Sequence, residues 1–537
     1  MDTLTAKTNP AHATASKPLM PIRVFNTLTK EKELLEPVVP GKVGIYLCGP
    51  TVYKPSHVGH MVGPVIFDAV KRYLTYSGYK VTLVINVTDV DDKLIAESHR
   101  RNMSMAALAE EMTADYMRNL HTMGIDTVDH FPKATDNIGE IIALTEALIA
   151  KGFAYASEGD VYFEVARDPQ YGKLSNRDVA SMLGEGGEMA GRKRSPADFA
   201  LWKSAKPGEP SWDSPWGKGR PGWHIECSAM SRSILGETFD IHGGGLDLVF
   251  PHHENEIAQS ECAHGKPQAK YWMHNGLMQS SHEVGKVGGR NTRELDAGDQ
   301  ASQEAGKLGK SKGAAPFTEL LARHAPETIR FFLLSTHYRR PIDFSETRIE
   351  EVNTGLEQFY RFFKRYERVA GETFYAIDYA RQRPAGDFEP GADATLSAVA
   401  EHRRRFLEAM DDDFNTGGAV ADLFELVRVL NKYVDENKLE AAKPSDAQLA
   451  VLRQGAKTLR ELGATVGLFR TAPERPAAGG GSAENEVVGK LMQLVIELRA
   501  AARAKKDFAT ADQIRNALTE IGIVLEDRPG GTEWTLK

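Results

Sequence analysis

Hydrophobic and polar positions near the start of the chain follow first a strand pattern and then a helical one. Residues 43–48, VGIYLC, form a short β-favouring run, and Gly49 and Pro50 mark a loop after it. From near Val58 apolar residues recur at helical spacing until Gly78 stops the pattern, and the next run, KVTLVINVT, has the composition of a buried strand. This order predicts a βαβ unit of a parallel sheet, in which ligands bind at the carboxyl ends of the strands.

The pattern changes near residue 125. Residues 125–215 contain a helical run, an alternating segment (GDVYFEV) and a stretch rich in glycine and charge. We therefore expect a domain inserted between two halves of the sheet, 21–124 and 216–278. Residues 279–306 are polar and glycine-rich without periodicity, which predicts a mobile loop.

The C-terminal half is mostly helical in pattern. A connecting region, 307–344, leads to helical spacing over 345–470, as in FELVRVLNKYV, which predicts a helical bundle. Residues 471–486 have the composition of a linker, and 487–537 predict a small unit of two helices and a terminal hairpin around PGG. We expect residues 1–20 to form a flexible tail.

Composition limits the class of protein. With 537 residues, 41% hydrophobic and 26% charged, the chain is long enough for several domains. The net charge of -8 gives no general attraction to nucleic acid, so an RNA partner would need local basic faces. Three cysteines do not make a disulfide framework, which favours a reducing compartment. No stretch has the character of a signal peptide or a membrane span, so we expect a soluble cytoplasmic protein without a membrane partner.

Two of the three cysteines belong to segments that together predict a metal site. Cys48 opens CGPTVYKPSHVGH, and Cys227 closes GWHIEC shortly before FPHHENE. If this last segment is helical, His252 and Glu256 are four residues apart and share a face. Two thiolates, an imidazole and a carboxylate are a ligand set that suits zinc. Cys262 would be rotated off this face, so we expect it to be a buried apolar thiol. The rival ligands from the same cluster are His253 and Glu254.

Two further segments contain the residues that phosphate binding requires. In HVGH, Gly59 lets a nucleotide approach the backbone, and His57 and His60 at a helix N-terminus can donate hydrogen bonds to a phosphate chain. In KLGKSKG, Lys307 and Lys310 can close over the phosphates and stabilise a leaving pyrophosphate. The plainer interpretations are a surface turn with two ordinary histidines and a solvated lysine-rich loop. Neither segment decides between these interpretations by itself.

The segment HGGGLDL is a third candidate for ligand binding. Its glycines, Gly244 among them, permit close approach by a flat ligand, and Asp247 can bind hydroxyl groups. The alternative interpretation is a tight turn that requires positive φ.

Taken in order, the motifs resemble those of the cysteinyl-tRNA synthetases, a family of class I aminoacyl-tRNA synthetases. The motifs are CGPTVY with HVGH, NVTDVDDK, GWHIECSAM, DIHGGGLDLVFPHHENEIAQSE and KLGKSK, and the resemblance runs from about residue 22 to residue 537. It implies an α/β fold with a Rossmann-type parallel-sheet catalytic domain and an inserted connective domain. A helical bundle and a small C-terminal α+β anticodon-binding domain would follow.

The resemblance also implies a reaction and its partners. Such an enzyme activates L-cysteine with ATP to cysteinyl-adenylate and pyrophosphate, and then transfers cysteine to the 3′ end of tRNA(Cys). Cysteine differs from serine by one atom, and a pocket without a metal obtains only modest selectivity from such a difference. We therefore expect one zinc ion per chain that binds the substrate thiolate, with Mg²⁺ accompanying ATP. We also expect a monomer that needs no editing domain.

By the same resemblance, individual residues acquire expected roles. HVGH and KLGKS correspond to the two class I signatures, which supply the catalytic residues His57, His60, Lys307 and Lys310. The expected contacts of ATP are His57, Gly59, His60, Gly244, Asp247 and Lys310. The expected zinc ligands are Cys48, Cys227, His252 and Glu256, and the residues expected to line the amino-acid pocket are Thr88 and Trp223.

The C-terminal unit resembles the family's anticodon-binding domain. Arg503 offers a cation for phosphate, and Phe508 offers a face for base stacking. Asp512 and Asp527 offer acceptors for base edges. For any single one of these residues, an amphipathic helix with a solvated charged face is an equally good interpretation.

The chain departs from the family's pattern at three places. Met61 and Val62 follow HVGH where the family often has a small residue and then arginine, so no role can be assigned to that arginine. Gly309 and Lys312 replace the usual serine and leucine of the second signature, which changes the expected stiffness of that loop but keeps both lysines. The stretch 279–306 is longer than the family's usual link.

Two rival functions are compatible with parts of the pattern. A cysteine ligase of thiol biosynthesis would activate cysteine in the same way and transfer it to an amino-sugar, but such ligases lack the anticodon domain. A noncatalytic RNA-binding or zinc-binding paralogue is disfavoured, because both signatures keep their histidines and lysines.

Overall fold

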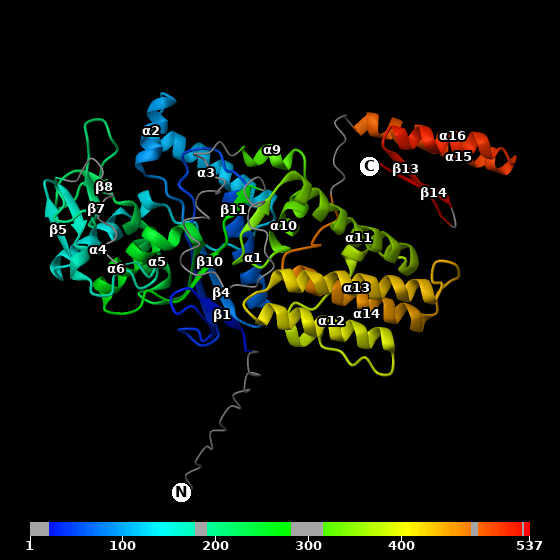
Figure 1. Ribbon diagram of the computed structural model, residues 1–537, viewed down its shortest axis with the longest axis horizontal. Helices are drawn as coiled ribbons and strands as arrows, with labels where there is room; N and C mark the ends of the chain where they lie inside the picture. The colour runs from blue at the N-terminus through cyan, green and yellow to red at the C-terminus, as the bar shows by residue number, and fades with distance from the viewer. Residues whose placement is uncertain (1–20, 178–190, 281–314, 474–481, 529–530, 537) are drawn as a thin grey trace, which may run out of the picture.

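The computed structural model describes residues 21–177, 191–280, 315–473, 482–528 and 531–536. It forms an elongated molecule (Figure 1). A small antiparallel sheet lies at one end and the C-terminal unit at the other, with the parallel sheet and the helical bundle between them.

The centre of the catalytic part is a four-stranded parallel sheet. Its strands are β3 (Lys42–Leu47), β4 (Lys80–Ile85), β9 (Phe239–Gly245) and β10 (Ala269–Asn275), in the order β10-β9-β3-β4. All neighbouring strands are parallel, and helix α1 (Gly59–Tyr76) connects β3 to β4, so the predicted βαβ unit is confirmed. The strands are apolar runs because both faces of a parallel sheet are covered.

Helices cover the two faces of this sheet. They are α1, α2 (Asp92–Arg100), α3 (Met105–Thr122), α5 (Trp223–Leu235) and α6 (Glu254–His264). A short hairpin, β1 (Arg23–Asn26) with β2 (Glu31–Leu34), packs beside β10. Ile45, Leu83 and Ile241 at the middle of three adjacent strands are completely buried. The rigid sheet therefore fixes the residues that follow each strand.

The segment inserted between the two halves of the sheet has its own core. It contains helix α4 (Ile138–Ala150) and an antiparallel sheet of β5 (Ala154–Ser157), β6 (Asp160–Phe163), β7 (Phe199–Ser204) and β8 (Gly219–Pro221). The rings of Phe163 and Phe199 stack with centroids 5.0 Å apart. Strand β8 ends at Pro221, a few residues beyond the predicted limit of 215, because it pairs with β7.

A connecting region joins the sheet to the bundle. Strand β11 (Met278–Ser280) pairs in parallel with β12 (Ile342–Phe344), and α9 (Phe317–Leu321) and α10 (Pro326–Leu334) lie between them in sequence. The predicted tail 1–20, the loop 279–306 beyond Ser280 and the middle of the linker, 474–481, lie outside the described residues.

Four long helices form the predicted bundle. They are α11 (Glu346–Ala370), α12 (Ala394–Asp411), α13 (Thr416–Glu436) and α14 (Asp446–Thr465). At the start of each helix, the side chain of the capping residue accepts a hydrogen bond from a backbone N–H of the first turn. The capping residues are Ser345, Asp393, Asn415 and Ser445.

The C-terminal unit consists of two helices and a hairpin, as predicted. Helices α15 (Ser482–Ala504) and α16 (Phe508–Glu520) precede the antiparallel strands β13 (Ile523–Arg528) and β14 (Gly531–Leu536). Its small core contains Met492, Leu518, Ile523 and Leu525. Within the described part of the chain, no helix combines the length and apolar character that crossing a membrane requires.

Candidate active site and metal centre

The candidate site lies at the carboxyl edge of the parallel sheet. Cys48 directly follows β3, and its N–H donates to the carbonyl of Gly243 near the end of β9 (3.1 Å). Thr88 follows β4 and forms a bridge with Thr51 of the loop after Cys48. The loops after three neighbouring strands therefore meet at one edge, where a parallel α/β sheet binds ligands.

The four predicted metal ligands come together at this edge. The ligand atoms of Cys48, Cys227, His252 and Glu256 all lie within 4.8 Å of one another. The Sγ atoms of Cys48 and Cys227 are 3.7 Å apart, although the two residues are 179 positions apart in the chain. Glu256 Oε1 is 3.4 Å from Cys48 Sγ and 3.1 Å from His252 Nε2. We call these four residues the metal quartet.

The donor chemistry of the metal quartet fits a zinc ion. Cys227, His252 and Glu256 are buried and Cys48 is half-buried. Two sulfurs and a carboxylate packed this closely without a cation would concentrate negative charge out of water, which is costly. A tetrahedral ion with nitrogen, sulfur and oxygen ligands would offset that charge.

The protonation preferences of the metal quartet follow from its crowding. The hydrogen bond from Cys48 lowers the pKa of Cys227 to about 6, whereas burial and the neighbouring Cys227 raise the pKa of Cys48. The two thiols thus favour sharing one proton. Burial alone would lower the pKa of His252, but the carboxylate of Glu256 raises it to about 10. A metal ion would displace these protons, because only deprotonated side chains bind it.

A second set of four groups shares two residues with the metal quartet. Cys48, His242, His253 and Glu256 also have ligand atoms within 4.8 Å of one another. His253 Nε2 lies 3.3 Å from Cys48 Sγ, and His242 Nε2 lies 2.9 Å from Glu256 Oε2. The rival ligand His253 therefore stays possible on geometry, but this set has one sulfur where the metal quartet has two.

The other rival ligand, Glu254, is used elsewhere. Its carboxylate accepts the backbone N–H groups of Gly172 (3.0 Å) and Ser175 (2.7 Å), which anchors the inserted segment to α6. Cys262 is half-buried and belongs to neither set, and burial raises its pKa to about 12. This thiol therefore favours the protonated, unreactive form.

Histidines that were not predicted as functional surround the metal quartet. His224 Nδ1 lies 3.0 Å from His252 Nδ1. His274 Nε2 lies 2.8 Å from His253 Nδ1, and His274 Nδ1 lies 2.8 Å from Thr27 Oγ1. His224 and His242 stand inside the motifs GWHIEC and DIHGGG, which gave some signal. His274 stands in no motif, so only the fold reveals it.

The first signature begins helix α1 as predicted. The rings of His57 and His60 lie with centroids 3.8 Å apart at the N-terminus of this helix, which has no side-chain cap. The Gly59 N–H donates to His57 Nδ1 (3.1 Å), and the His57 N–H donates to His60 Nδ1 (3.3 Å). Because each Nδ1 accepts a backbone proton, the neutral rings carry their own proton on Nε2.

Lys307 and Lys310 of the second signature lie outside the described residues. The chain that follows them is fixed, because the Phe317 N–H donates to the carbonyl of Ser56 (2.7 Å). Ser56 immediately precedes His57. Phe317, which follows the second signature in the sequence, is therefore held next to the first signature.

The glycines of HGGG are required by packing. A Cβ on Gly243 would lie 2.2 Å from Phe67 Cζ of α1, and a Cβ on Gly244 would lie 2.6 Å from His253 Cε1. Gly244 does not need a positive φ, so the alternative of a tight positive-φ turn does not describe it. Contacts of Gly244 and Asp247 with ATP stay predictions.

The two residues predicted for the amino-acid pocket lie in different surroundings. The exposed indole of Trp223 stacks on the ring of His252, with centroids 4.3 Å apart. Thr88 is buried at the edge of the sheet, and its hydroxyl accepts from Asn86 Nδ2 (3.3 Å). Trp223 therefore lies against one member of the metal quartet, whereas contacts of either residue with the amino acid stay predictions.

The residues predicted to bind tRNA differ in how they are engaged. Phe508 has 60% of its surface exposed, and Asp512 and Arg503 are exposed as well. Asp527 accepts two hydrogen bonds from Arg499 (2.5 and 2.7 Å), which lower its pKa strongly, and a third from Arg503 (2.8 Å). This carboxylate holds β13 to α15, so base recognition by Asp527 would have to compete with these bonds.

Family models match three parts of this architecture. Residues 34–287 match the tRNA synthetases class I (C) catalytic domain, 405–470 the DALR domain and 494–534 the cysteinyl-tRNA ligase anticodon binding domain. Two structures of methionyl-tRNA synthetase from Mycobacterium tuberculosis, both with methionyl-adenylate, share the fold at TM-scores of 0.53 and 0.55. They are 14% and 15% identical and cover 79% of this chain and 90% of theirs.

Closer relatives agree with these matches. The chain is 44% identical to the cysteine–tRNA ligases of Geobacter metallireducens and Pelobacter propionicus, over 96% of its own length and 100% of theirs. The parallel sheet, the HVGH helix and the match to the catalytic domain define a class I aminoacyl-tRNA synthetase. More narrowly, the chain belongs to the cysteine–tRNA ligase family. The resemblance identified from the motifs is confirmed.

Proposed function

We propose that the chain activates L-cysteine with ATP and transfers it to tRNA(Cys). The observation that carries the proposal is the metal quartet, which places two sulfurs, a nitrogen and an oxygen at the carboxyl edge of a class I sheet. The match of residues 494–534 to an anticodon binding domain favours tRNA over the amino-sugar acceptor of a thiol-biosynthesis ligase. The proposal includes a monomeric protein that acts in the cytoplasm, where translation uses the product.

Within this proposal the metal quartet selects the amino acid. A zinc ion held there supplies a soft acceptor that binds a thiolate sulfur in preference to a hydroxyl. Trp223, stacked on His252, would cover the bound side chain, and Thr88 would contact it from the edge of the sheet. Selection would then occur on binding, without an editing site.

The two signatures serve the adenylation step. The cysteine carboxylate attacks the α-phosphate of ATP, and charge develops on the phosphates as pyrophosphate leaves. His57 and His60 can donate from Nε2, while Lys307, Lys310 and Mg²⁺ offset charge on the pyrophosphate. The substrates supply both nucleophile and leaving group, so positioning and electrostatics provide the acceleration.

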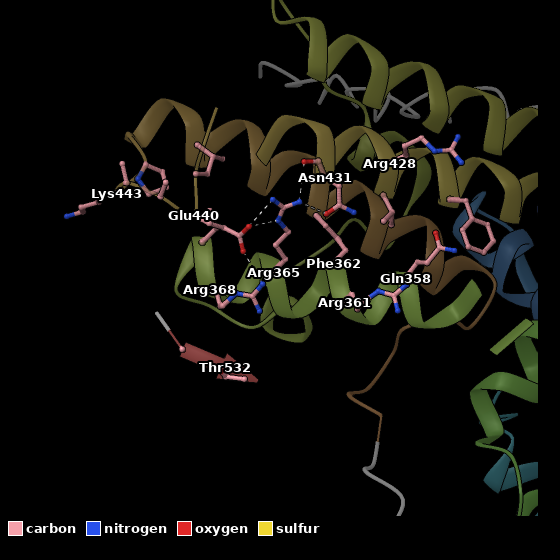
Figure 2. Close-up of a pocket in the computed structure, with 18 of the residues that line it drawn as sticks. Gln358, Arg361, Phe362, Arg365, Arg368, Arg428, Asn431, Glu440, Lys443 and Thr532 are labelled. Carbon is pink, nitrogen blue, oxygen red and sulfur yellow. Dashed lines mark hydrogen bonds and ion pairs between the residues drawn. The ribbon is translucent and has the colours of Figure 1, made fainter. Parts of the chain in front are cut away.

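A groove lined by basic side chains lies between the bundle and the C-terminal unit and is a candidate binding surface for tRNA. Figure 2 shows arginines of α11 and α13 along this groove of about 1370 Å³, with Thr532 of β14 across from α11. The cations that line it are Arg361, Arg365, Arg368, Arg428 and Lys443. The four arginines are paired with Glu357, Glu425, Asp435 and Glu440, so tRNA phosphates would compete with these carboxylates for the local basic face that the chain's net charge of -8 requires. Phosphates of tRNA would bind here, and bases at the C-terminal unit.

Charging assays test the proposed function directly. Purified protein should attach cysteine to tRNA, should fail to attach serine at a comparable rate, and should contain one zinc ion per chain by elemental analysis. Cysteine-dependent exchange of pyrophosphate into ATP without tRNA charging would instead favour the amino-sugar ligase. Absence of both activities in folded protein would support a noncatalytic paralogue.

The groove gives a second prediction. Replacing Arg361 and Arg428 together with alanine should weaken tRNA binding and make the salt dependence shallower, by about one unit of slope for each phosphate that is no longer neutralised. Their side chains are 54% and 72% exposed, so folding should be unaffected. Arg404→Ala is the control, because Arg404 is also 54% exposed but lies on α12 outside the groove. If the unmodified protein, the double variant and Arg404→Ala bind tRNA with equal affinity and equal salt dependence, the groove is not part of the tRNA-binding surface.

A further inference from the structure

Each member of the metal quartet lies beside at least one polar side chain outside the quartet. Three of these neighbours are histidines: His253 Nε2 to Cys48 Sγ at 3.3 Å, His242 Nε2 to Glu256 Oε2 at 2.9 Å, and His224 Nδ1 to His252 Nδ1 at 3.0 Å. Such partners orient metal ligands and tune their donor strength. The remaining member is Cys227, and the side chain beside its sulfur is Tyr46.

Tyr46 occupies a fixed place beneath the metal quartet. It lies on β3 two residues before Cys48, so both side chains project from the same face of the sheet. It is opposite His242 of β9 in the strand register, and its ring meets the His242 ring edge-on with centroids 5.4 Å apart. The whole side chain is 0% exposed, so the ring has no room to turn its hydroxyl toward solvent.

The hydroxyl of Tyr46 lacks the partner that a buried hydroxyl normally has. Among the described residues, no nitrogen or oxygen atom forms a hydrogen bond with it. The thiols of Cys227 and Cys48 and the carboxylate of Glu256 lie close enough to act on it, and Tyr46 packs in the same buried cluster as Cys227. A buried O–H without an acceptor is costly, and a sulfur that becomes a thiolate is a strong acceptor.

We propose that Tyr46 is a positioning residue of the metal centre, whose hydroxyl donates a hydrogen bond to Cys227 Sγ when this sulfur is a metal ligand. The inference rests on the proposed function, because it needs the metal quartet to hold an ion. The hydrogen bond would fix the direction of the sulfur lone pairs and withdraw some of their charge. When the sulfur of Cys227 donates less charge to the ion, the ion accepts the sulfur of the substrate more readily. Selection of cysteine requires such binding of the substrate sulfur.

A packing role for Tyr46 is the alternative, and phenylalanine separates the two. Tyr46→Phe keeps the ring and removes only the hydroxyl. Tyr116→Phe is the matched control, because Tyr116 is also buried (1% exposed) and its hydroxyl also has no hydrogen-bond partner in the described part of the chain, but it lies on α3. A packing role predicts that the two variants behave alike.

The experiment uses the full-length protein loaded with cobalt(II) in place of zinc. Thiolate-to-cobalt absorption should move to lower energy in Tyr46→Phe, because Cys227 donates more charge, and should stay unchanged in Tyr116→Phe. Release of zinc to a chelator should show an affinity lower by about 10–100-fold in Tyr46→Phe alone, because loss of the fixed sulfur direction outweighs the stronger donation. The KM for cysteine should rise while the KM for ATP stays constant.

A second experiment restores a hydrogen-bond donor at position 46. 4-Aminophenylalanine at position 46 keeps the ring and supplies an N–H, so it should return the absorption band toward that of the unmodified protein, even if Tyr46→Phe folds poorly. Identical spectra and chelator release in the unmodified protein, Tyr46→Phe and Tyr116→Phe would overturn the proposal. Unmodified protein that shows no thiolate-to-cobalt absorption at all would overturn the proposed metal role itself, which is a distinguishable result.

Discussion

Replacing Cys227 with serine is expected to release the bound zinc and to remove the preference for cysteine over serine. Cys227 is one of two sulfurs in the metal quartet, and its Sγ lies 3.7 Å from Cys48 Sγ in a buried site. A hydroxyl is a poor ligand for zinc. Loss of an outer partner alone costs about 10–100-fold in metal affinity, so loss of a direct ligand should cost more.

The loss of selectivity follows from the loss of the metal. Without a metal, the pocket would have to distinguish a thiol from a hydroxyl by shape and weak hydrogen bonding, which supports a ratio of only about 10–200. Zinc content by elemental analysis and pyrophosphate exchange with cysteine and serine side by side measure both effects. Cys262→Ser is the control, because Cys262 is half-buried and outside both candidate ligand sets.

The same variant distinguishes the two candidate ligand sets. If the ion instead sits among Cys48, His242, His253 and Glu256, Cys227→Ser should retain zinc and His253→Asn should lose it. If the metal quartet binds the ion, Cys227→Ser should lose zinc and His253→Asn should retain it. Normal zinc content together with unchanged selectivity in Cys227→Ser would contradict the proposed role of the quartet.

The sequence was sufficient to predict the parallel sheet and the convergence of the four ligands. Both follow from local signals that agree with one another. The apolar strands lead directly into Cys48 and Thr88, so the residues that follow them must meet at one edge. His252 lies in the short helical segment Val249–His253 that leads into α6, and Glu256 lies in the first turn of α6, so their spacing of four brings both to one face.

The contacts around the ligands could not be predicted, because they depend on which strands become neighbours. His274 reaches His253 only because β10 pairs with β9, and no local pattern states that pairing. Glu254 was a reasonable rival ligand by sequence, but its carboxylate is taken by backbone N–H groups of the inserted segment. Long-range packing decides such roles, and a motif records only the residue types.

The C-terminal unit shows a further limit of prediction from the sequence. Its two helices and hairpin follow from periodicity and the PGG turn, but periodicity does not say which charges are exposed. Asp527 is bound by Arg499 and Arg503, whereas Phe508 projects into solvent. Of the four residues predicted to contact tRNA, Phe508 is therefore the better target for testing base stacking, and Asp527 for testing the stability of the unit.

At the first signature, His60→Asn is expected to slow adenylate formation by about 10²–10³, which corresponds to about 2.7–4 kcal/mol of lost transition-state stabilisation. His60 Nδ1 accepts the His57 N–H at 3.3 Å, so the proton of the neutral ring resides on Nε2. That atom is the one able to donate to a phosphate oxygen as charge develops. Asparagine can still accept at the position of Nδ1, but it is too short to donate from the position of Nε2.

His60→Gln is the matched variant, because its longer side chain places an amide N–H near the position of Nε2. Single-turnover formation of cysteinyl-adenylate should therefore recover in part with glutamine and not with asparagine. Zinc content and the KM for cysteine should be unchanged in both, since His60 lies outside the metal quartet. Equal rates in the two variants would show that an N–H at the position of Nε2 does not act on the phosphate, because only glutamine places one there.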